Sequence, residues 1–146
     1  MSDDLMQDPR LAAVLDTIVP ARGGIEGAGG LGLAGAVLAD AQANGTVADL
    51  IAVLDALPSQ FASLDAGARE SALRAIEATD PESVASVVNM VYTAYYTQPH
   101  VLAGISERTG YNPGPPQPSG YVLDPFDPTL LEPVRERAPL WRPDDI

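Results

Sequence analysis

The sequence predicts an all-α protein, a small bundle of about five helices that continues into an extended arm rich in proline and aromatic residues. Apolar residues recur at helical spacing in the segments before residue 97. Ten of the fourteen prolines lie from Pro99 onward, where they oppose further long helices. A chain of 146 residues suits one domain that folds without metals or crosslinks. We therefore expect a helical domain at residues 1–109 and a proline-rich arm at residues 110–146 that packs on this domain or on a partner.

Two helices are predicted on either side of a glycine-rich loop. Asp8 can cap a helix that carries proline in its first turn and ends at Pro20. The loop covers residues 21–32. A helix of small residues follows at residues 33–43, and Gly45 ends it because glycine readily adopts the left-handed conformation found at helix ends.

Three further helices are predicted in the middle of the chain. Thr46 and Asp49 resemble a capping box in front of a helix that ends before Pro58. A second helix spans about residues 65–78, and the longest helix begins after Asp80. The residues expected to face the core are Val47, Leu50, Ile51, Leu54 and Leu57 in the first helix, Ala68, Ala72, Leu73 and Ile76 in the second, and Val84, Val87, Val88, Val91, Tyr92 and Tyr95 in the third.

The arm differs in kind from the rest of the chain. Its residues 110–121 are too rich in proline and glycine to continue a helix or to fill a central strand. A short helix is predicted to begin at Asp127 and to be limited by Pro133. So broken a segment cannot form its own core, and its apolar side chains need a surface on the helical domain or on another protein. These side chains are Leu130, Leu131, Val134, Leu140 and Trp141.

Composition excludes several classes of function. The chain has eight arginines, no lysine and twenty acidic residues, and its net charge of -12 repels phosphate backbones, so we expect no nucleic-acid partner. No cysteine is present, which excludes disulfides, thiolate metal sites and cysteine nucleophiles. No apolar stretch reaches the ~20 residues of a membrane span, so no membrane insertion is expected. The acidic first residues lack the features of a secretory signal, and we expect a cytoplasmic protein unless a signal-bearing partner exports it.

Motifs that could carry chemistry have simpler structural interpretations. Residues 27–32 match the dinucleotide pattern G-x-G-x-x-G, but the residues before them have helical rather than strand character, so we interpret them as an interhelical loop. His100 is the only histidine, and neither a metal-site spacing nor a G-x-S-x-G motif accompanies it. Paired carboxylates such as Asp80 and Glu82 lie beside prolines and are interpreted as helix caps. We predict no catalytic, cofactor-binding or metal-binding residue in this chain.

Aromatic residues are concentrated in the second half of the chain. Seven of the eight lie after position 90, first at the end of the long helix and then in the arm. Core packing and a protein–protein interface both bury such residues, and for the arm the two interpretations stay equally open. The candidate interface residues are Tyr95, Tyr96, His100, Tyr111, Pro115, Pro116, Tyr121, Phe126, Trp141 and Arg142.

Three segments of the chain resemble a known family. Residues 95–101 (Tyr-Tyr-Thr-Gln-Pro-His-Val) and residues 110–121, with their Gly-Pro-Pro-Gln-Pro core, are similar to the gluconate 2-dehydrogenase subunit 3 family, and residues 15–20 resemble that family's opening helix. The resemblance implies a non-catalytic small subunit that binds and stabilises or matures a larger flavoprotein of the glucose-methanol-choline (GMC) oxidoreductase type. It places FAD and the oxidation of a sugar or alcohol in that partner, within a hetero-oligomer. Many family members carry a twin-arginine export signal, which this sequence lacks.

Two alternatives to the accessory subunit remain open. One is a stand-alone small helical enzyme, a lyase or isomerase that uses tyrosine and carboxylate groups on a small polar substrate. The other is a dedicated chaperone that releases its flavoprotein client after cofactor loading.

Overall fold

The computed structural model describes residues 2–112, 114 and 125–137. Contacts divide the chain into two units, Met1–Pro113 and Gly114–Ile146. The all-α class is confirmed, because the described residues form eight α-helices and no strand. These helices are α1 (Ser2–Met6), α2 (Pro9–Ile18), α3 (Ala34–Asn44), α4 (Val47–Ala56), α5 (Ala66–Glu77), α6 (Pro81–Tyr96), α7 (Pro99–Thr109) and α8 (Glu132–Arg135), with 3₁₀ turns at Phe61–Ser63 (η1) and Pro128–Leu131 (η2).

The predicted number of about five helices is wrong, because α1 and α7 were not anticipated and the short helix expected in the arm was not counted in the bundle. Helix α7 places Pro99 in its first turn, where a missing N–H costs nothing, and ends at Gly110, whose φ of 71° is left-handed. Pro133 was expected to limit the helix in the arm. It lies instead in the first turn of α8, which continues directly from η2.

The helix starts show which capping predictions hold. Asp8 accepts a hydrogen bond from the Arg10 N–H at 2.8 Å, and Asp80 accepts one from the Ser83 N–H at 3.1 Å, as caps do. The capping box at Thr46 is wrong. Its backbone, at φ -104° and ψ 17°, is not extended, its side chain caps nothing, and its buried hydroxyl has no hydrogen-bond partner among the described residues.

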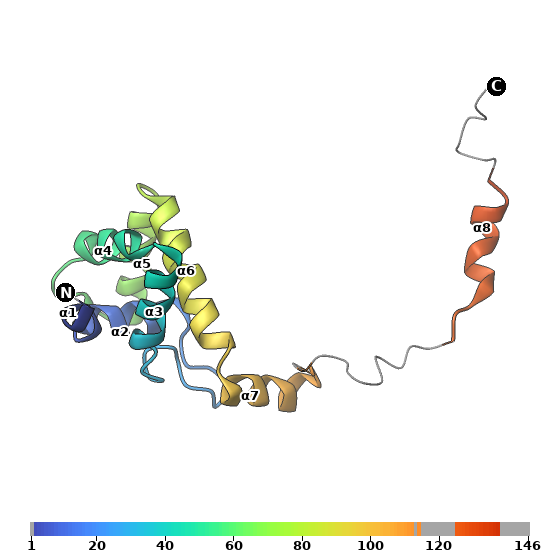
Figure 1. Ribbon diagram of the computed structural model, residues 1–146, viewed down its shortest axis with the longest axis horizontal. Helices are drawn as coiled ribbons and strands as arrows, with labels where there is room; N and C mark the ends of the chain where they lie inside the picture. Colours follow the sequence, from blue (N-terminus) through green and yellow to red (C-terminus); the bar gives the residue numbers. More distant parts are fainter. Residues whose placement is uncertain (1, 113, 115–124, 138–146) are drawn as a thin grey trace, which may run out of the picture. The chain divides into compact units, whose positions relative to one another are not determined.

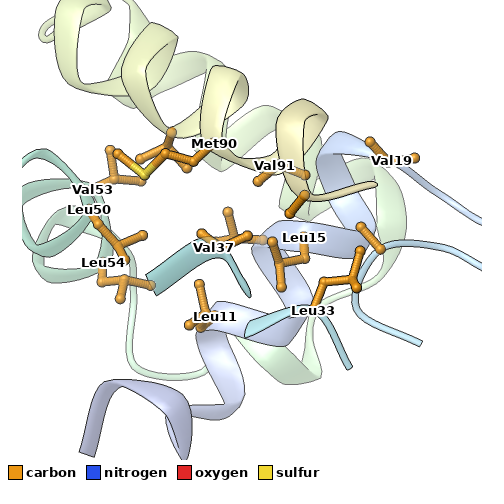
Figure 2. Close-up of a cluster of buried hydrophobic side chains, with 14 of the residues drawn as sticks. Leu11, Leu15, Val19, Leu33, Val37, Leu50, Val53, Leu54, Met90 and Val91 are labelled. Carbon is orange, nitrogen blue, oxygen red and sulfur yellow. The ribbon is translucent and has the colours of Figure 1, made fainter. Parts of the chain in front are cut away.

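Helix α6 is the centre of the first unit and contacts α2, α3, α4, α5 and α7 (Figure 1). The core lies where α2, α3 and α4 meet α6, and its side chains point toward one another across this space (Figure 2). The side chains labelled there are Leu11, Leu15, Val19, Leu33, Val37, Leu50, Val53, Leu54, Met90 and Val91.

The predicted apolar stripes are only partly buried. On α5, Ile76 alone is buried, while Ala68, Ala72 and Leu73 are half-buried, because this helix packs at the edge of the unit against α2 and α6. On α6, the stripe was expected to include Tyr92, yet 45% of that residue is exposed. Its exposed ring belongs to the candidate site described next.

Candidate functional site

The glycine-rich loop between α2 and α3 is folded around a carboxylate of the chain itself. Asp16, on α2, accepts hydrogen bonds from the N–H groups of Gly29 at 2.8 Å and Gly30 at 3.2 Å. A Cβ at position 29 would lie 2.2 Å from the carbonyl oxygen of Ala12, so only glycine allows the loop to approach α2 this closely. The interhelical-loop interpretation of residues 27–32 is confirmed, because a helix precedes them and Asp16 occupies their amide groups.

The same loop is tied to α7 at its other end. Arg22 and Ile25 exchange both of their backbone hydrogen bonds, at 3.0 and 3.1 Å, around a tight turn. The Ile25 side chain lies against Gly104, where a Cβ would approach its Cδ1 to 2.9 Å. Arg108 donates from Nη1 to the carbonyl of Gly23 at 3.2 Å. These contacts place the loop, the end of α6 and α7 around one hollow.

This hollow, which we call the tyrosine cleft, has a volume of about 510 Å³. That size is within the ~300–1,000 Å³ of many ligand sites. Aliphatic side chains line part of it, the tyrosines of α6 form another part, and two arginines complete the lining. The residues used below are Ile18, Ile25, Tyr92, Tyr96, Arg22 and Arg108.

The three tyrosines at the end of α6 have two different roles. Tyr95 is only 5% exposed, and its hydroxyl donates to the Glu26 carbonyl at 3.0 Å, which joins α6 to the loop. Burial raises the pKa of Tyr95, and the neighbouring Tyr96 raises it further, whereas the charge of Arg108 lowers it. The Tyr95 hydroxyl therefore stays protonated at neutral pH. Tyr96 packs edge-to-face on both other rings, with centroids 5.1 Å from Tyr95 and 5.8 Å from Tyr92. Tyr92 and Tyr96 are 45% and 47% exposed and present their rings to the cleft.

The two arginines of the cleft differ from Arg10 and Arg74, and resemble Arg69, which bonds to the backbone carbonyl of Ala62. Arg10 pairs with Asp8 at 2.7 Å, and Arg74 pairs with Glu70 at 2.7 Å. Within the described part of the chain, Arg22 has no side-chain hydrogen bond or ion pair, and Arg108 bonds only to backbone carbonyls. Both charges therefore lack a carboxylate partner, and the cleft lining contains no acidic side chain.

The second unit carries a separate apolar surface. Asp127 caps η2 by accepting from the Thr129 N–H at 2.9 Å, and α8 follows directly. No residue of this unit's described part, 114 and 125–137, is buried. Phe126, Leu130 and Val134 are 64%, 67% and 60% exposed, so large apolar side chains stand in solvent at a spacing of four residues.

The predicted interface residues fall at different places. Tyr95 and Tyr96 line the cleft, whereas His100 is exposed in the first turn of α7 and is not part of the lining. Tyr111 is 57% exposed just after α7, and Phe126 belongs to the second unit. Pro115, Pro116, Tyr121, Trp141 and Arg142 lie outside the described residues.

Sequence reasoning missed Arg22, Ile25 and Arg108 as site residues. Arg22 precedes two glycines at the turn of the loop, which is the one local signal that could have singled it out. Arg108 is 86 positions away in the sequence, and only the folded loop brings the two side chains to the same cleft.

Metal sites and membrane-spanning helices are absent from the described residues. No three His, Cys, Asp or Glu side chains there come together in a way that could hold a metal ion. None of the helices that the structure describes is long and apolar enough to cross a bilayer. No family model, curated protein or solved structure matches the chain.

Proposed function

We propose that this chain is a non-catalytic accessory subunit that binds a larger protein and stabilises or matures it. The observation that carries the proposal is the exposed apolar surface of the second unit. Single exposed apolar residues are common in proteins. Leu130 and Val134 instead lie four residues apart on η2 and α8, Phe126 lies four residues before Leu130 and just ahead of the Asp127 cap, and none of the three is buried. Two apolar anchors on consecutive helical turns, with a third just before them, suit insertion into an apolar groove of a partner.

The partner in this proposal is a GMC-type, FAD-dependent dehydrogenase of sugars or alcohols. Support for its identity is the resemblance of residues 95–101 and 110–121 to the gluconate 2-dehydrogenase subunit 3 family. In the resulting hetero-oligomer the larger subunit holds the flavin and performs the oxidation. This chain contributes contacts, and we place no cofactor on it.

Co-expression with a candidate flavoprotein tests the proposal. We expect a yellow complex of fixed stoichiometry in size exclusion, and a lower soluble yield of the flavoprotein when it is expressed alone, because its contact surface is then exposed. The variant Leu130→Ala should weaken the complex. Met6→Ala is a matched control, because Met6 is also an exposed apolar residue (44%) but lies on α1 of the other unit. A colourless chain that elutes alone beside a fully active flavoprotein would refute the proposal.

The tyrosine cleft favours a second candidate, a stand-alone enzyme acting on a small polar substrate. The cleft has the volume of a ligand site. Against catalysis, Tyr95 is bonded to Glu26 and has a raised pKa, so it is a poor general base at neutral pH. Turnover of a lyase or isomerase substrate by the purified chain, without a partner, would favour this candidate over the accessory subunit.

A further inference from the structure

We propose that the tyrosine cleft binds a short acidic and apolar segment of the partner subunit. A carboxylate of that segment pairs with Arg22 and Arg108, and an adjacent apolar side chain lies on the exposed rings of Tyr92 and Tyr96. The inference rests on the proposed function in one respect, because it takes the occupant to belong to the partner. It adds a second contact surface, distinct from the apolar residues of the second unit.

Charge is the first argument for this occupant. The chain carries a net charge of -12, so most of its surface repels an acidic segment. The tyrosine cleft is lined by two arginines and no carboxylate. The neighbouring hollow that also includes Ile18 and Tyr92 contains Glu70 and Glu77 beside Arg74, so it lacks the positive character of the tyrosine cleft. Complementary charge of this kind selects partners and orients their approach.

The state of the two guanidinium groups is the second argument. Arg22 has no side-chain hydrogen bond among the described residues, and Arg108 uses Nε and Nη1 on the carbonyls of Gly104 and Gly23. Each keeps N–H donors for a ligand, and arginine binds carboxylates with two parallel hydrogen bonds. The contacts of Arg108 also hold its side chain toward the loop, so one of the two groups is already oriented.

The tyrosine rings are the third argument. Tyr96 is fixed edge-to-face between Tyr92 and Tyr95, yet about half of Tyr92 and Tyr96 remains exposed. Their hydroxyls make no hydrogen bond within the described part of the chain and can donate to an incoming carboxylate. Tyrosine combines a large apolar area with few rotatable bonds, and protein interfaces are enriched in it.

The size and firmness of the cleft match a short segment. A volume of about 510 Å³ accommodates a few side chains, as a drug-sized ligand site does. Its wall is held by the bond from Tyr95 to Glu26 and by the contact of Ile25 with Gly104. A preformed site loses little conformational entropy on binding, so even a short segment can be held.

A library of random heptapeptides displayed on phage and selected on the purified full chain tests the inference. We expect enrichment of sequences with Asp or Glu next to an aromatic or aliphatic residue. The best synthetic peptide should bind about tenfold more tightly than its amide analogue with Asn or Gln in place of the acid. Enrichment of basic or uncharged sequences, or no enrichment, would overturn the inference.

Variants of the chain locate the binding. Arg22→Gln should lower the affinity for the acidic peptide about tenfold, so that this variant binds the acidic and amide peptides alike. Arg22→Lys should recover part of the lost affinity. Arg74→Gln removes the same charge outside the cleft, next to Glu70, and should leave the affinity unchanged. Equal loss in the Arg22 and Arg74 variants would overturn the inference by showing a nonspecific charge effect. Thermal unfolding of each variant checks that the fold is intact.

Other occupants give different results. If phenylacetate saturates the cleft at a lower concentration than the selected peptide does, the occupant is a small carboxylate. If the chain self-associates and the peptide reverses this association, the occupant is a second copy of the chain. Either outcome overturns the inference. A chain that binds the peptide but forms no yellow complex refutes the proposed function and leaves standing only the preference of the cleft for acidic and apolar segments. A yellow complex unaffected by Arg22→Gln refutes the cleft inference alone.

Discussion

Removing the carboxylate of Asp16 should release the glycine-rich loop from α2. This carboxylate accepts the N–H groups of Gly29 and Gly30, at 2.8 and 3.2 Å, and the structure records no other partner for these two donors among the described residues. In Asp16→Ala both donors lose their acceptor. The loop would then keep the contacts at its α7 end and the bond from the Ala28 N–H to the Val19 carbonyl, but lose its hydrogen bonds to the side chain on α2.

The expected loss of stability follows from the two hydrogen bonds. Bonds to a charged group contribute about 1.5–3 kcal/mol each. The bond to Gly30 is exposed, so water replaces it cheaply, and most of the loss comes from the part-buried bond to Gly29. Alanine returns up to ~0.7 kcal/mol through its higher helix propensity. We expect a net loss of about 2 kcal/mol in the free energy of unfolding, which lowers Tm by roughly 8 °C in a unit of this size.

Calorimetry of Asp16→Ala, Asp16→Asn and Asp40→Ala measures this effect. Asn keeps one oxygen acceptor and should lose about half as much as Ala. Asp40→Ala is the control, because Asp40 also lies within a helix, α3, and makes no hydrogen bond or ion pair within the described residues. Its stability should change by less than ~0.5 kcal/mol. Hydrogen exchange at Gly29 and Gly30 should accelerate in Asp16→Ala. An equal Tm for Asp16→Ala and Asp40→Ala would refute the anchoring of the loop by Asp16.

Three further substitutions test other contacts. Tyr95→Phe removes the hydroxyl that donates to the Glu26 carbonyl, and urea unfolding should show a loss of about 1 kcal/mol; no loss would mean that this bond does not hold the cleft wall. The pKa of Asp8 is lowered chiefly by its hydrogen bond with Arg10. The ion pair between the two residues therefore stabilises the fold fully above pH 3.8, the ordinary pKa of an aspartate. This stabilisation is lost as the pH falls through the lower pKa that Asp8 has in the folded state. The wild type should therefore be more stable than Asp8→Asn at pH 6 and lose that advantage below pH 3.8, as measured by urea unfolding across this range. A difference in unfolding free energy that does not depend on pH would contradict the role of the ion pair. Leu130→Ala should leave Tm unchanged, because this residue is 67% exposed. It should raise the Kd of the partner complex by a factor of about 30, as expected for the loss of an interface anchor. If titration calorimetry finds an unchanged Kd, the second unit is not part of the interface.

Much of the helical unit could be predicted from the sequence because its signals are local. Prolines and acidic caps mark the first turns of α2 and α6, and Gly45, with φ of 72°, ends α3 as expected. Helix α7 was missed because Pro99 was counted with the prolines of the arm. The same residue type that ends one helix can begin the next, and only the following residues, such as the buried Val101, distinguish the two cases.

The candidate site was less predictable because its parts are distant in sequence. Tyr96 was named among the interface residues, but Tyr92 was assigned to the core on periodicity alone. The five helices that contact α6, namely α2, α3, α4, α5 and α7, leave the Tyr92 side chain exposed. The arginines gave no periodic signal. Arg22 and Arg108 meet at the cleft only because the loop folds back on α7.

The proposed contact surfaces lie on separate units of one chain, and this arrangement has an energetic consequence. When either surface engages the partner, the other binds as an intramolecular step at a high effective concentration, provided that the connection spans both sites. Neither surface then needs high affinity by itself. This explains how a cleft with two arginines and a segment with three exposed apolar anchors could together hold a large subunit. The Asp16 anchor contributes indirectly, because a loop held against α2 keeps Arg22 in place before the partner arrives.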